Sequence, residues 1–295
     1  MEIFLARTHG FCSGVANAIN IVEDALKQYN LPIYVYHEIV HNTSVVDDFR
    51  RRGVIFVEDI DDVPISATLI FSAHGVPPAA ITKAQMRKLK IIDATCPLVT
   101  KVHKEAMRLS KKNYHVVLIG HKGHQEIIGT SGYIKENLLH IIQDEKDIES
   151  LSLNSDTPIA YLTQTTLSID DTDKLIKKLK QKFPYLQAPS SECICYATQK
   201  RQQAVKELAT FCDIIIICGS KNSSNSNRLR ETGENAGVKT LLIDKATELD
   251  TNILDTKSKI GISSGASVPS YIVDEVIKKI QTKYPDAKLH KLGNK

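Results

Sequence analysis

Three of the six cysteines in this 295-residue chain stand in the same local context. Cys12 in "GFCSGV", Cys96 in "DATCPLV" and Cys195 in "ECICYAT" each directly precede a segment with helical periodicity. A helix amino terminus has about half a positive charge, which favours the thiolate form of a cysteine. Thiolates bind iron and zinc in proteins, so these three cysteines are candidate metal ligands.

The segments that follow the three cysteines repeat in order. Each expected helix leads into a short apolar run and then into a polar loop. These loops contain His41, His124 and Ser223, which lie 29, 28 and 28 positions after the respective cysteines. The recurrence of this interval indicates three copies of one structural unit.

Each unit then has a second expected strand that ends in a polar turn. These turns contain His74, Thr165 and Ser267, and Ser224 and Asn225 directly follow Ser223 in the third unit's first loop. Imidazoles, hydroxyls and amides at strand ends can bind a small, strongly anionic group such as a diphosphate without a lysine or arginine clamp. Considered singly, each histidine could equally make a structural hydrogen bond.

A set of three thiolates indicates an incomplete ligand set. Complete cubane iron–sulfur clusters normally use four cysteines, so three predict a cluster with one iron that has no protein ligand. Such an iron can act as a Lewis acid on a substrate oxygen. Zinc is the competing metal, although zinc sites more often use closely spaced cysteine pairs.

The other three cysteines have simpler interpretations. Cys212 ends an expected helix and Cys218 ends a run of isoleucines, so both are expected to be buried in the core. Cys193 lies two residues before Cys195 and remains a possible spare ligand.

Glu126 is the carboxylate that lies within these turns beside a candidate ligand histidine, in "GHKGHQE". Together with Thr165, from the neighbouring strand end of the same unit, it could transfer a proton to a reacting group. A helix-capping glutamate is the alternative interpretation.

Short apolar runs such as "HVVLIG" and "DIIIICG" alternate with longer helical segments. This pattern predicts parallel strands buried on both faces, and hence three small α/β domains around a pseudo-threefold axis with a central iron–sulfur site. The expected boundaries are 1–96, 97–194 and 195–281, followed by a tail at 282–295 with no assigned role. The chain contains no dinucleotide fingerprint and no P-loop motif.

The composition is ordinary, with 42% hydrophobic and 24% charged residues and a formal net charge of +4. The lysines are spread over helical segments rather than gathered in a basic stripe, which disfavours nucleic-acid binding. No apolar run is long enough for a membrane helix, and no signal peptide is evident, so we expect a cytoplasmic protein without a disulfide framework.

The motifs together resemble those of the hydroxymethylbutenyl diphosphate reductases, the last enzymes of the non-mevalonate isoprenoid pathway. The similarity runs from residue 1 to about 280 and includes "GFCSGV", "SAHGVP", "DATCPLV", "GHKGHQE", "TQTTLS", "CYAT", "GSKNSSNSNRL" and "SGAS". The presence of Cys193 departs from the family, which usually has another residue there.

The resemblance implies one [4Fe–4S] cluster held by Cys12, Cys96 and Cys195, with the fourth iron binding the substrate hydroxyl. It implies that Glu126 serves the proton transfer and that the substrate, mostly its diphosphate, is surrounded by His41, His74, His124, Thr165, Ser223, Ser224, Asn225 and Ser267. Two electrons from a ferredoxin or flavodoxin and two protons would then yield isopentenyl and dimethylallyl diphosphate, with the domains closing over the substrate.

Two other functions remain as alternatives at this point. An iron–sulfur redox sensor would need the cluster but not the polar loops. A zinc-dependent hydrolase would use Glu126 as a base and would be colourless.

Overall fold

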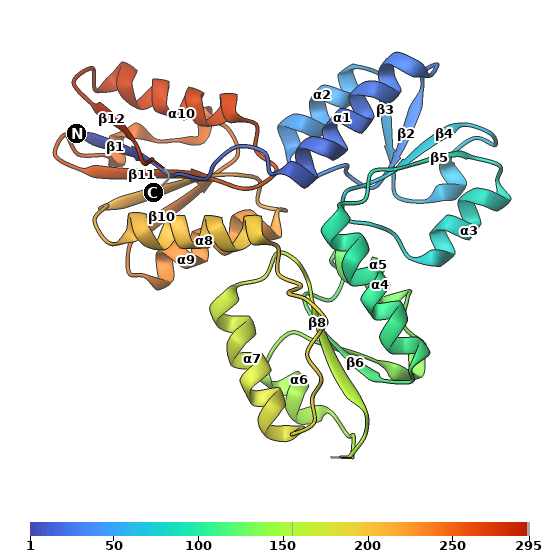
Figure 1. The fold of residues 1–295 in the computed structure, drawn as a ribbon. Helices are drawn as coiled ribbons and strands as arrows, with labels where there is room; N and C mark the ends of the chain where they lie inside the picture. The colour runs from blue at the N-terminus through green and yellow to red at the C-terminus, as the bar shows by residue number, and fades with distance from the viewer. Residues whose placement is uncertain (155, 294–295) are drawn as a thin grey trace. The chain divides into compact units, whose positions relative to one another are not determined.

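The structure is a computed structural model, and it describes residues 1–154 and 156–293 (Figure 1). Its strands form three separate sheets, and the strand pairings within each of them are parallel. The prediction of an α/β fold with small parallel sheets is therefore confirmed.

The largest sheet has five strands in the order β10-β9-β11-β1-β12. Its strands are β1 (Glu2–Leu5), β9 (Ile214–Cys218), β10 (Lys239–Ile243), β11 (Lys259–Ser264) and β12 (Lys288–Lys291), and its helices are α8 (Tyr196–Ala209), α9 (Ser224–Asn235) and α10 (Ser270–Lys283).

Alternate residues of β9 face opposite sides of this sheet and enter different cores. Ile216 packs in one cluster with Val273 and Val276 of α10, whereas Ile215 packs in another with Val205 of α8. All five residues of β9 are buried, as expected for a central strand covered on both faces. Figure 1 shows α10 on one side of the sheet and α8 and α9 on the other.

A second sheet has four strands in the order β3-β2-β4-β5. It consists of β2 (Ile33–Tyr36), β3 (Val54–Val57), β4 (Thr68–Phe71) and β5 (Lys90–Asp93), and the segment also contains α1 (Ser13–Gln28), α2 (Thr43–Arg51) and α3 (Pro78–Met86). Leu69 and Phe71 of β4 pack with Ala80 and Ala84 of α3, which gives this sheet its own core.

The third sheet has three strands in the order β7-β6-β8. It consists of β6 (His115–Ile119), β7 (Leu139–Ile142) and β8 (Ile159–Thr163), with α4 (Pro97–Lys111), α5 (Gln125–Ser131), α6 (Glu145–Ser150) and α7 (Ile169–Lys182). Leu118 of β6 packs with Val102 of α4 and Ile127 of α5, while Val117 and Ile119 face Leu175 and Leu179 of α7.

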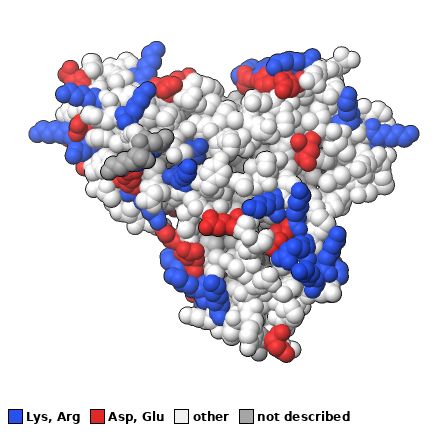
Figure 2. Space-filling view, viewed as in Figure 1, with Lys and Arg blue, Asp and Glu red and all other residues white. Residues whose placement is uncertain are grey.

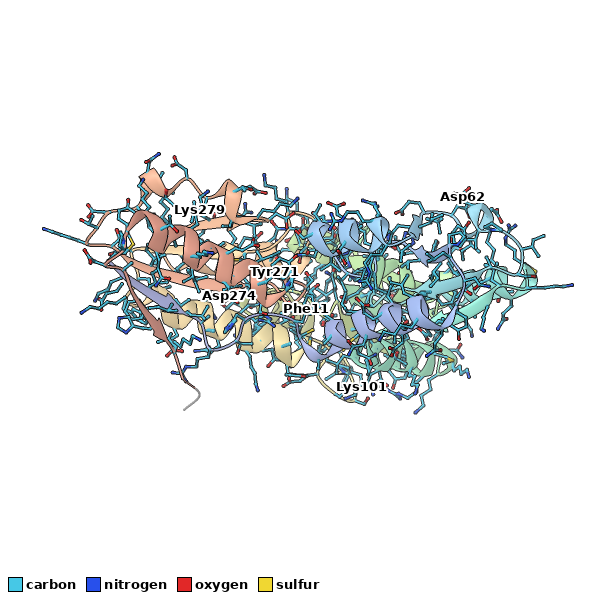
Figure 3. The ribbon with its side chains drawn as sticks, turned by 90° about the horizontal axis from the view of Figure 1, so that it is seen from above. Phe11, Asp62, Lys101, Tyr271, Asp274 and Lys279 are labelled. Atoms are coloured by element: carbon cyan, nitrogen blue, oxygen red, sulfur yellow. The ribbon has the colours of Figure 1, made fainter. Side chains whose placement is uncertain are left out.

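Short 3₁₀ segments complete the described secondary structure, at Ile60–Asp62, Glu136–Leu138, Ala246–Glu248 and Thr251–Ile253. Lys279 of α10 donates a hydrogen bond of 2.8 Å from Nζ to the Ala246 carbonyl oxygen, which ties the helix to one of these segments. Figure 3 shows Tyr271, Asp274 and Lys279 following one another along α10.

Two strands lie in a sheet that the expected boundaries do not predict. β1 lies between β11 and β12, and it pairs along its whole length with both of them. The expected domain 1–96 contains β1 together with β2–β5, and the expected tail 282–295 contains β12. A four-residue apolar strand does not encode which distant strands it will join, so its sequence could not reveal this pairing.

The chain divides into two compact units, which we describe separately. Unit 1 comprises Met1–Ser13, His41–Asp48 and Tyr196–Lys295, and unit 2 comprises Gly14–Val40 and Phe49–Cys195. Unit 1 contains the five-stranded sheet, and unit 2 contains the two smaller sheets.

The described surface carries charges of both signs. On the face drawn in Figure 2, Lys and Arg side chains are scattered, and Asp and Glu side chains lie among them. Among the described helices, none is both long and apolar enough to cross a membrane.

Candidate active site

The three candidate ligand cysteines lie where the sequence predicts, at the beginnings of helices. Cys12 directly precedes α1, Cys96 is the N-cap residue of α4, and Cys195 directly precedes α8. All three are of intermediate exposure and stand outside any described disulfide.

The backbone around these cysteines repeats three times with the same hydrogen bond. In each repeat the cysteine N–H donates to a carbonyl oxygen in the loop after the second strand. The three bonds run from Cys12 to Ala266, from Cys96 to Ala73 and from Cys195 to Thr165, and each N···O distance is 3.0 Å. The repeat inferred from cysteine spacing is therefore present in the backbone geometry.

This repeated bond corrects one detail of the comparison between the three sequence repeats. Thr165 occupies the position of Ala73 and Ala266, so the residue equivalent to His74 and Ser267 is Thr166. Thr165 is therefore special to its own repeat, because its side chain makes contacts that alanine cannot make.

The candidate residues are divided between the two units. Unit 1 contains Cys12, His41, Ser223, Ser224, Asn225 and Ser267, and unit 2 contains Cys96, Cys195, His74, His124, Glu126 and Thr165. Within residues 1–154 and 156–293, no three His, Cys, Asp or Glu side chains form a group that could hold a metal ion.

In unit 2 the structure brings Glu126 and Thr165 together. The Thr165 backbone N–H donates to Glu126 Oε2 at 2.8 Å, and the Thr165 hydroxyl lies 2.9 and 2.8 Å from the two carboxylate oxygens. Both side chains are buried, with exposed fractions of 5% and 6%. Glu126 lies in the first turn of α5, where the helix dipole also favours a carboxylate.

Two histidines lie beside each other in the same unit. His124 is the N-cap of α5, and its Nδ1 accepts a hydrogen bond of 3.2 Å from the Glu126 backbone N–H. The His74 ring meets the His124 ring edge to face, with centroids 6.2 Å apart. His124 therefore links the first turn of α5 to the turn that follows β4.

In unit 1 the polar loops contact one another. Ser267 Oγ donates a hydrogen bond of 2.8 Å to the His41 carbonyl oxygen. Ser223 is the N-cap of α9, and its Oγ accepts from the Ser226 backbone N–H at 3.3 Å and from the Ser226 hydroxyl at 3.1 Å. The Ser267 bond thus joins two of these loops, and the Ser223 bonds fix the first turn of α9.

Asn225 follows Ser224 in the first turn of α9. Its side chain is buried, yet neither Nδ2 nor Oδ1 has a hydrogen-bond partner among the described residues. A buried amide without partners costs stability unless a ligand or water satisfies it. This side chain is therefore suited to bind a polar ligand.

Ser226 packs against the turns that follow β9 and β11. A Cβ added at Gly219 or at Gly265 would lie 2.2 Å from Ser226 Oγ, so both positions require glycine for this approach. These glycines follow β9 and β11 directly, which lets the start of α9 approach the ends of both strands.

The remaining three cysteines are buried in apolar surroundings. Burial raises the pKa of the Cys193 thiol above its usual range, and it raises the pKa of Cys212 and of Cys218 to about 12. All three side chains belong to apolar clusters. Cys212 and Cys218 are buried as the sequence predicts.

Arg201 is a buried residue near Cys12 that sequence reasoning missed. Its side chain is 1% exposed, and its guanidinium donates to the Gly10 carbonyl oxygen at 2.8 Å and to the Ser264 carbonyl oxygen at 3.4 Å. Its position in α8 could have revealed it, because it shares the helical stripe of the buried Ala197 and Leu208.

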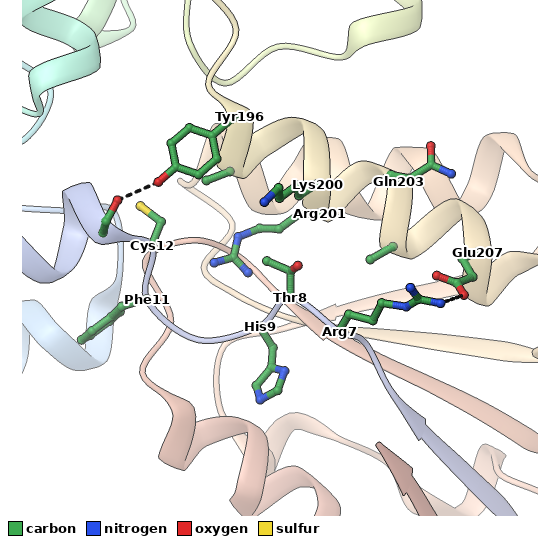
Figure 4. A pocket seen from close by; sticks show the side chains of 13 residues that line it. Arg7, Thr8, His9, Phe11, Cys12, Tyr196, Lys200, Arg201, Gln203 and Glu207 are labelled. Atoms are coloured by element: carbon green, nitrogen blue, oxygen red, sulfur yellow. Dashed lines mark hydrogen bonds and ion pairs between the residues drawn. The ribbon is translucent and has the colours of Figure 1, made fainter. Parts of the chain in front are cut away.

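Arg201 lines a surface pocket of about 500 Å³ in unit 1, together with Cys12. Figure 4 shows the Cys12 thiol and the Tyr196 ring at one end of this pocket and the Arg7–Glu207 ion pair at the other. The Tyr196 hydroxyl and Ser13 Oγ are 2.9 Å apart. Cys12 therefore borders a solvent-accessible hollow lined by several basic side chains.

Known proteins resemble this chain over nearly its whole length. A relative from Acinetobacter baylyi is 50% identical over 284 residues, which cover 95% of this chain and 90% of the relative, and a relative from Histophilus somni is 51% identical over 283 residues with the same coverage. Both are described as 4-hydroxy-3-methylbut-2-enyl diphosphate reductases.

Two solved structures are also similar. The E-1-hydroxy-2-methyl-but-2-enyl-4-diphosphate reductase from Plasmodium falciparum has a TM-score of 0.96 and 39% identity, with 99% of this chain and 92% of that chain covered. An (E)-4-hydroxy-3-methyl-but-2-enyl diphosphate reductase, described as the terminal enzyme of the non-mevalonate pathway, has a TM-score of 0.68 and 32% identity, with 96% and 100% covered. The family model described as LytB protein matches residues 3–281, and the chain therefore belongs to the LytB protein family.

Proposed function

We propose that this chain catalyses the reductive removal of the hydroxyl group from 4-hydroxy-3-methylbut-2-enyl diphosphate. The observation that supports this most strongly is the 50% identity to a reductase of that name over 95% of the chain. In the overall reaction two electrons and two protons enter, the allylic C–O bond breaks, a C–H bond forms and water leaves. Isopentenyl and dimethylallyl diphosphate are the expected products.

The chemistry of the cysteines supports an iron–sulfur cofactor. Cys12, Cys96 and Cys195 are partly exposed, stand outside any described disulfide and are held by the same backbone hydrogen bond, so their chemistry and local geometry fit thiolate ligation. We propose that they hold one [4Fe–4S] cluster. When bound, such a cluster supplies electrons and an iron without a protein ligand, which can act as a Lewis acid.

The neutral polar groups of both units are suited to the substrate's diphosphate. His41, Asn225 and Ser267 in unit 1 and His74 and His124 in unit 2 offer imidazole, amide and hydroxyl donors. Ser223 and Ser224 add hydroxyls at the amino terminus of α9, where the helix dipole favours an anion. The unsatisfied Asn225 amide supports this assignment most directly.

We assign proton transfer to Glu126, with Thr165 as its partner. Two donor groups of Thr165 fix the Glu126 carboxylate, so a proton on one carboxyl oxygen has a defined position. Its buried surroundings exclude bulk water from this step.

We propose a ferredoxin or flavodoxin as the electron donor. Such proteins are usually acidic, and the formal net charge of +4 is compatible with their approach. A reducing compartment such as the cytoplasm suits a protein that needs three free ligand thiols.

The test is turnover under anaerobic conditions. The purified protein is analysed for iron, sulfide and zinc, and is then incubated with the substrate and a chemically reduced low-potential donor. We expect a brown protein that contains iron and sulfide and forms both diphosphate products. A colourless anaerobic preparation with stoichiometric zinc and no products would overturn the proposal in favour of a zinc enzyme.

A further inference from the structure

His103 is a buried histidine to which the proposed function assigns no role. It lies on α4, two helical turns after Cys96, and its side chain is 5% exposed. Its ring stacks on the Tyr133 ring with centroids 4.5 Å apart, and it also borders a pocket of about 190 Å³.

The imidazole of His103 packs directly against backbone on two sides. A Cβ added at Gly75 would lie 2.5 Å from His103 Cε1, and a Cβ added at Gly129 would lie 3.3 Å from His103 Nε2. The added Gly129 Cβ would also lie 3.3 Å from the Gly75 carbonyl oxygen. The ring, the Gly75 turn and the Gly129 turn of α5 therefore meet at one point.

Both glycines belong to segments that position candidate site residues. Gly75 directly follows His74, and its φ of +75° places it in the left-handed region that favours glycine. Gly129 lies three residues after Glu126 on α5, and residues at this spacing share one face of a helix. One imidazole thus contacts the turn of a candidate diphosphate ligand and the helix of the candidate proton donor.

The segment that carries His103 is itself anchored to the same turn. The Cys96 backbone N–H, at the start of α4, donates to the Ala73 carbonyl oxygen at 3.0 Å. A displacement of the His103 ring would therefore shift the His74 turn relative to both Cys96 and Glu126.

The buried Nε2 atom of His103 makes no hydrogen bond within the described residues that would explain a histidine at this position. Burial also lowers the pKa of His103 to about 4, so the ring is neutral at physiological pH. His103 therefore provides a flat, neutral ring that packs against the Gly75 turn and against Gly129 of α5.

We propose that His103 is a positioning residue that sets the distance between the His74 turn and α5. At this distance the His74 turn can bind the substrate's diphosphate while Glu126 transfers a proton to the same molecule. This inference rests on the proposed function, because it takes the roles of His74 and Glu126 from there. A misplacement of about 1 Å at a reacting group can lower a rate about 100-fold.

The test compares two single variants with a matched control. His103→Asn removes the ring, and Gly129→Ala inserts a methyl group between the ring and the Gly75 turn while leaving His103 intact. His140→Asn is the control, because His140 lies on β7 in the same unit and contacts His115 instead, with ring nitrogens 2.9 Å apart.

We expect both test variants to lower kcat about 10-fold to 100-fold and to raise KM several-fold. Iron content should remain within the range of the His140→Asn control, whereas the thermal unfolding midpoint of His103→Asn should fall because a buried ring is lost, so kinetics are measured well below that midpoint. The double variant should lose less than the product of the two single losses, because both changes act on one contact. Unchanged kcat and KM, or losses that merely follow iron content, would overturn the inference.

Binding of inorganic diphosphate to the anaerobic holoenzyme separates this inference from the proposed function. If the wild-type protein shows no turnover, the proposed function fails. A diphosphate affinity that is weaker in His103→Asn than in His140→Asn would still support positioning of the His74 turn. If the wild-type protein turns over and both test variants match it, only the positioning role fails.

Discussion

Glu126 is the residue whose surroundings most restrict its chemistry. Its carboxylate is buried, lies in the first turn of α5 and accepts hydrogen bonds from both the backbone and the hydroxyl of Thr165. The sequence places Glu126 and Thr165 in neighbouring loops, but only the fold shows that one side chain fixes the other. The carboxylate is therefore held in one orientation.

We predict that Glu126→Gln retains the fold, the iron content and substrate binding but lowers kcat by about 100-fold or more, because an amide cannot supply the proton. Anaerobic turnover and diphosphate binding, measured side by side, check this. Glu105→Gln is the control, since Glu105 is a poorly exposed carboxylate of the same unit that pairs with Arg108 at 2.7 Å. Full activity in Glu126→Gln would remove Glu126 from the mechanism.

A second prediction concerns His103 and pH. Its pKa is about 4 in the folded protein, against an ordinary value of 6.5. Between these values the unfolded chain binds more protons, so the free energy of unfolding decreases as the pH falls from 6.5 towards 4, by up to about 3 kcal/mol. Urea unfolding of the reduced, metal-free chain measures this decrease.

The matched variant for the pH prediction is His103→Asn. Because asparagine does not titrate, its free energy of unfolding should decline less than that of the wild type across the same interval. Equal declines in the two proteins would assign the pH dependence to other groups.

At the scale of elements, the five-stranded sheet of unit 1 shows what local patterns miss. The apolar run of β9 and the helical stripe of α8 are visible in the sequence, whereas the place of β1 between β11 and β12 is not. Arg201 illustrates the same point, because the stripe of α8 predicts its burial but not its hydrogen bond to the Gly10 carbonyl oxygen.

We predict that β12 stabilises this sheet although it lies near the end of the chain. Leu289 packs against the core shared by β1 and α10, so Leu289→Ser should lower the free energy of unfolding by about 1–3 kcal/mol. Lys288→Ser, at the exposed neighbouring position of the same strand, should change it by less than about 0.5 kcal/mol. Denaturant unfolding distinguishes the two, and equal effects would contradict a packing role for Leu289.

At the scale of the whole molecule, the proposed ligand set draws on both units. Cys12 belongs to unit 1, whereas Cys96 and Cys195 belong to unit 2. One cofactor bound by all three would therefore join two parts of the chain that each have their own core. The equal cysteine hydrogen bonds of 3.0 Å indicate that each repeat presents its cysteine in the same way.

We predict that Cys12→Ser, Cys96→Ser and Cys195→Ser each lose the stable cluster, while Cys193→Ser keeps it, because the Cys193 thiol is buried in an apolar cluster. Iron and sulfide analysis of anaerobic preparations checks this. Amide hydrogen exchange should show that iron loading protects both units of the wild-type chain. Full iron content in Cys12→Ser would contradict a ligand set shared between the units.

The sequence by itself determined the parallel α/β character, the three helix-start cysteines and the polar residues at strand ends. Apolar runs, helical stripes and loop spacings are local, so the chain encodes them within short segments. Only the tertiary structure decided that Thr165 holds the Glu126 carboxylate, that Arg201 lies buried under the Gly10 loop, and that β1 and β12 complete a distant sheet. These features depend on contacts between residues far apart in the chain, which no local pattern specifies.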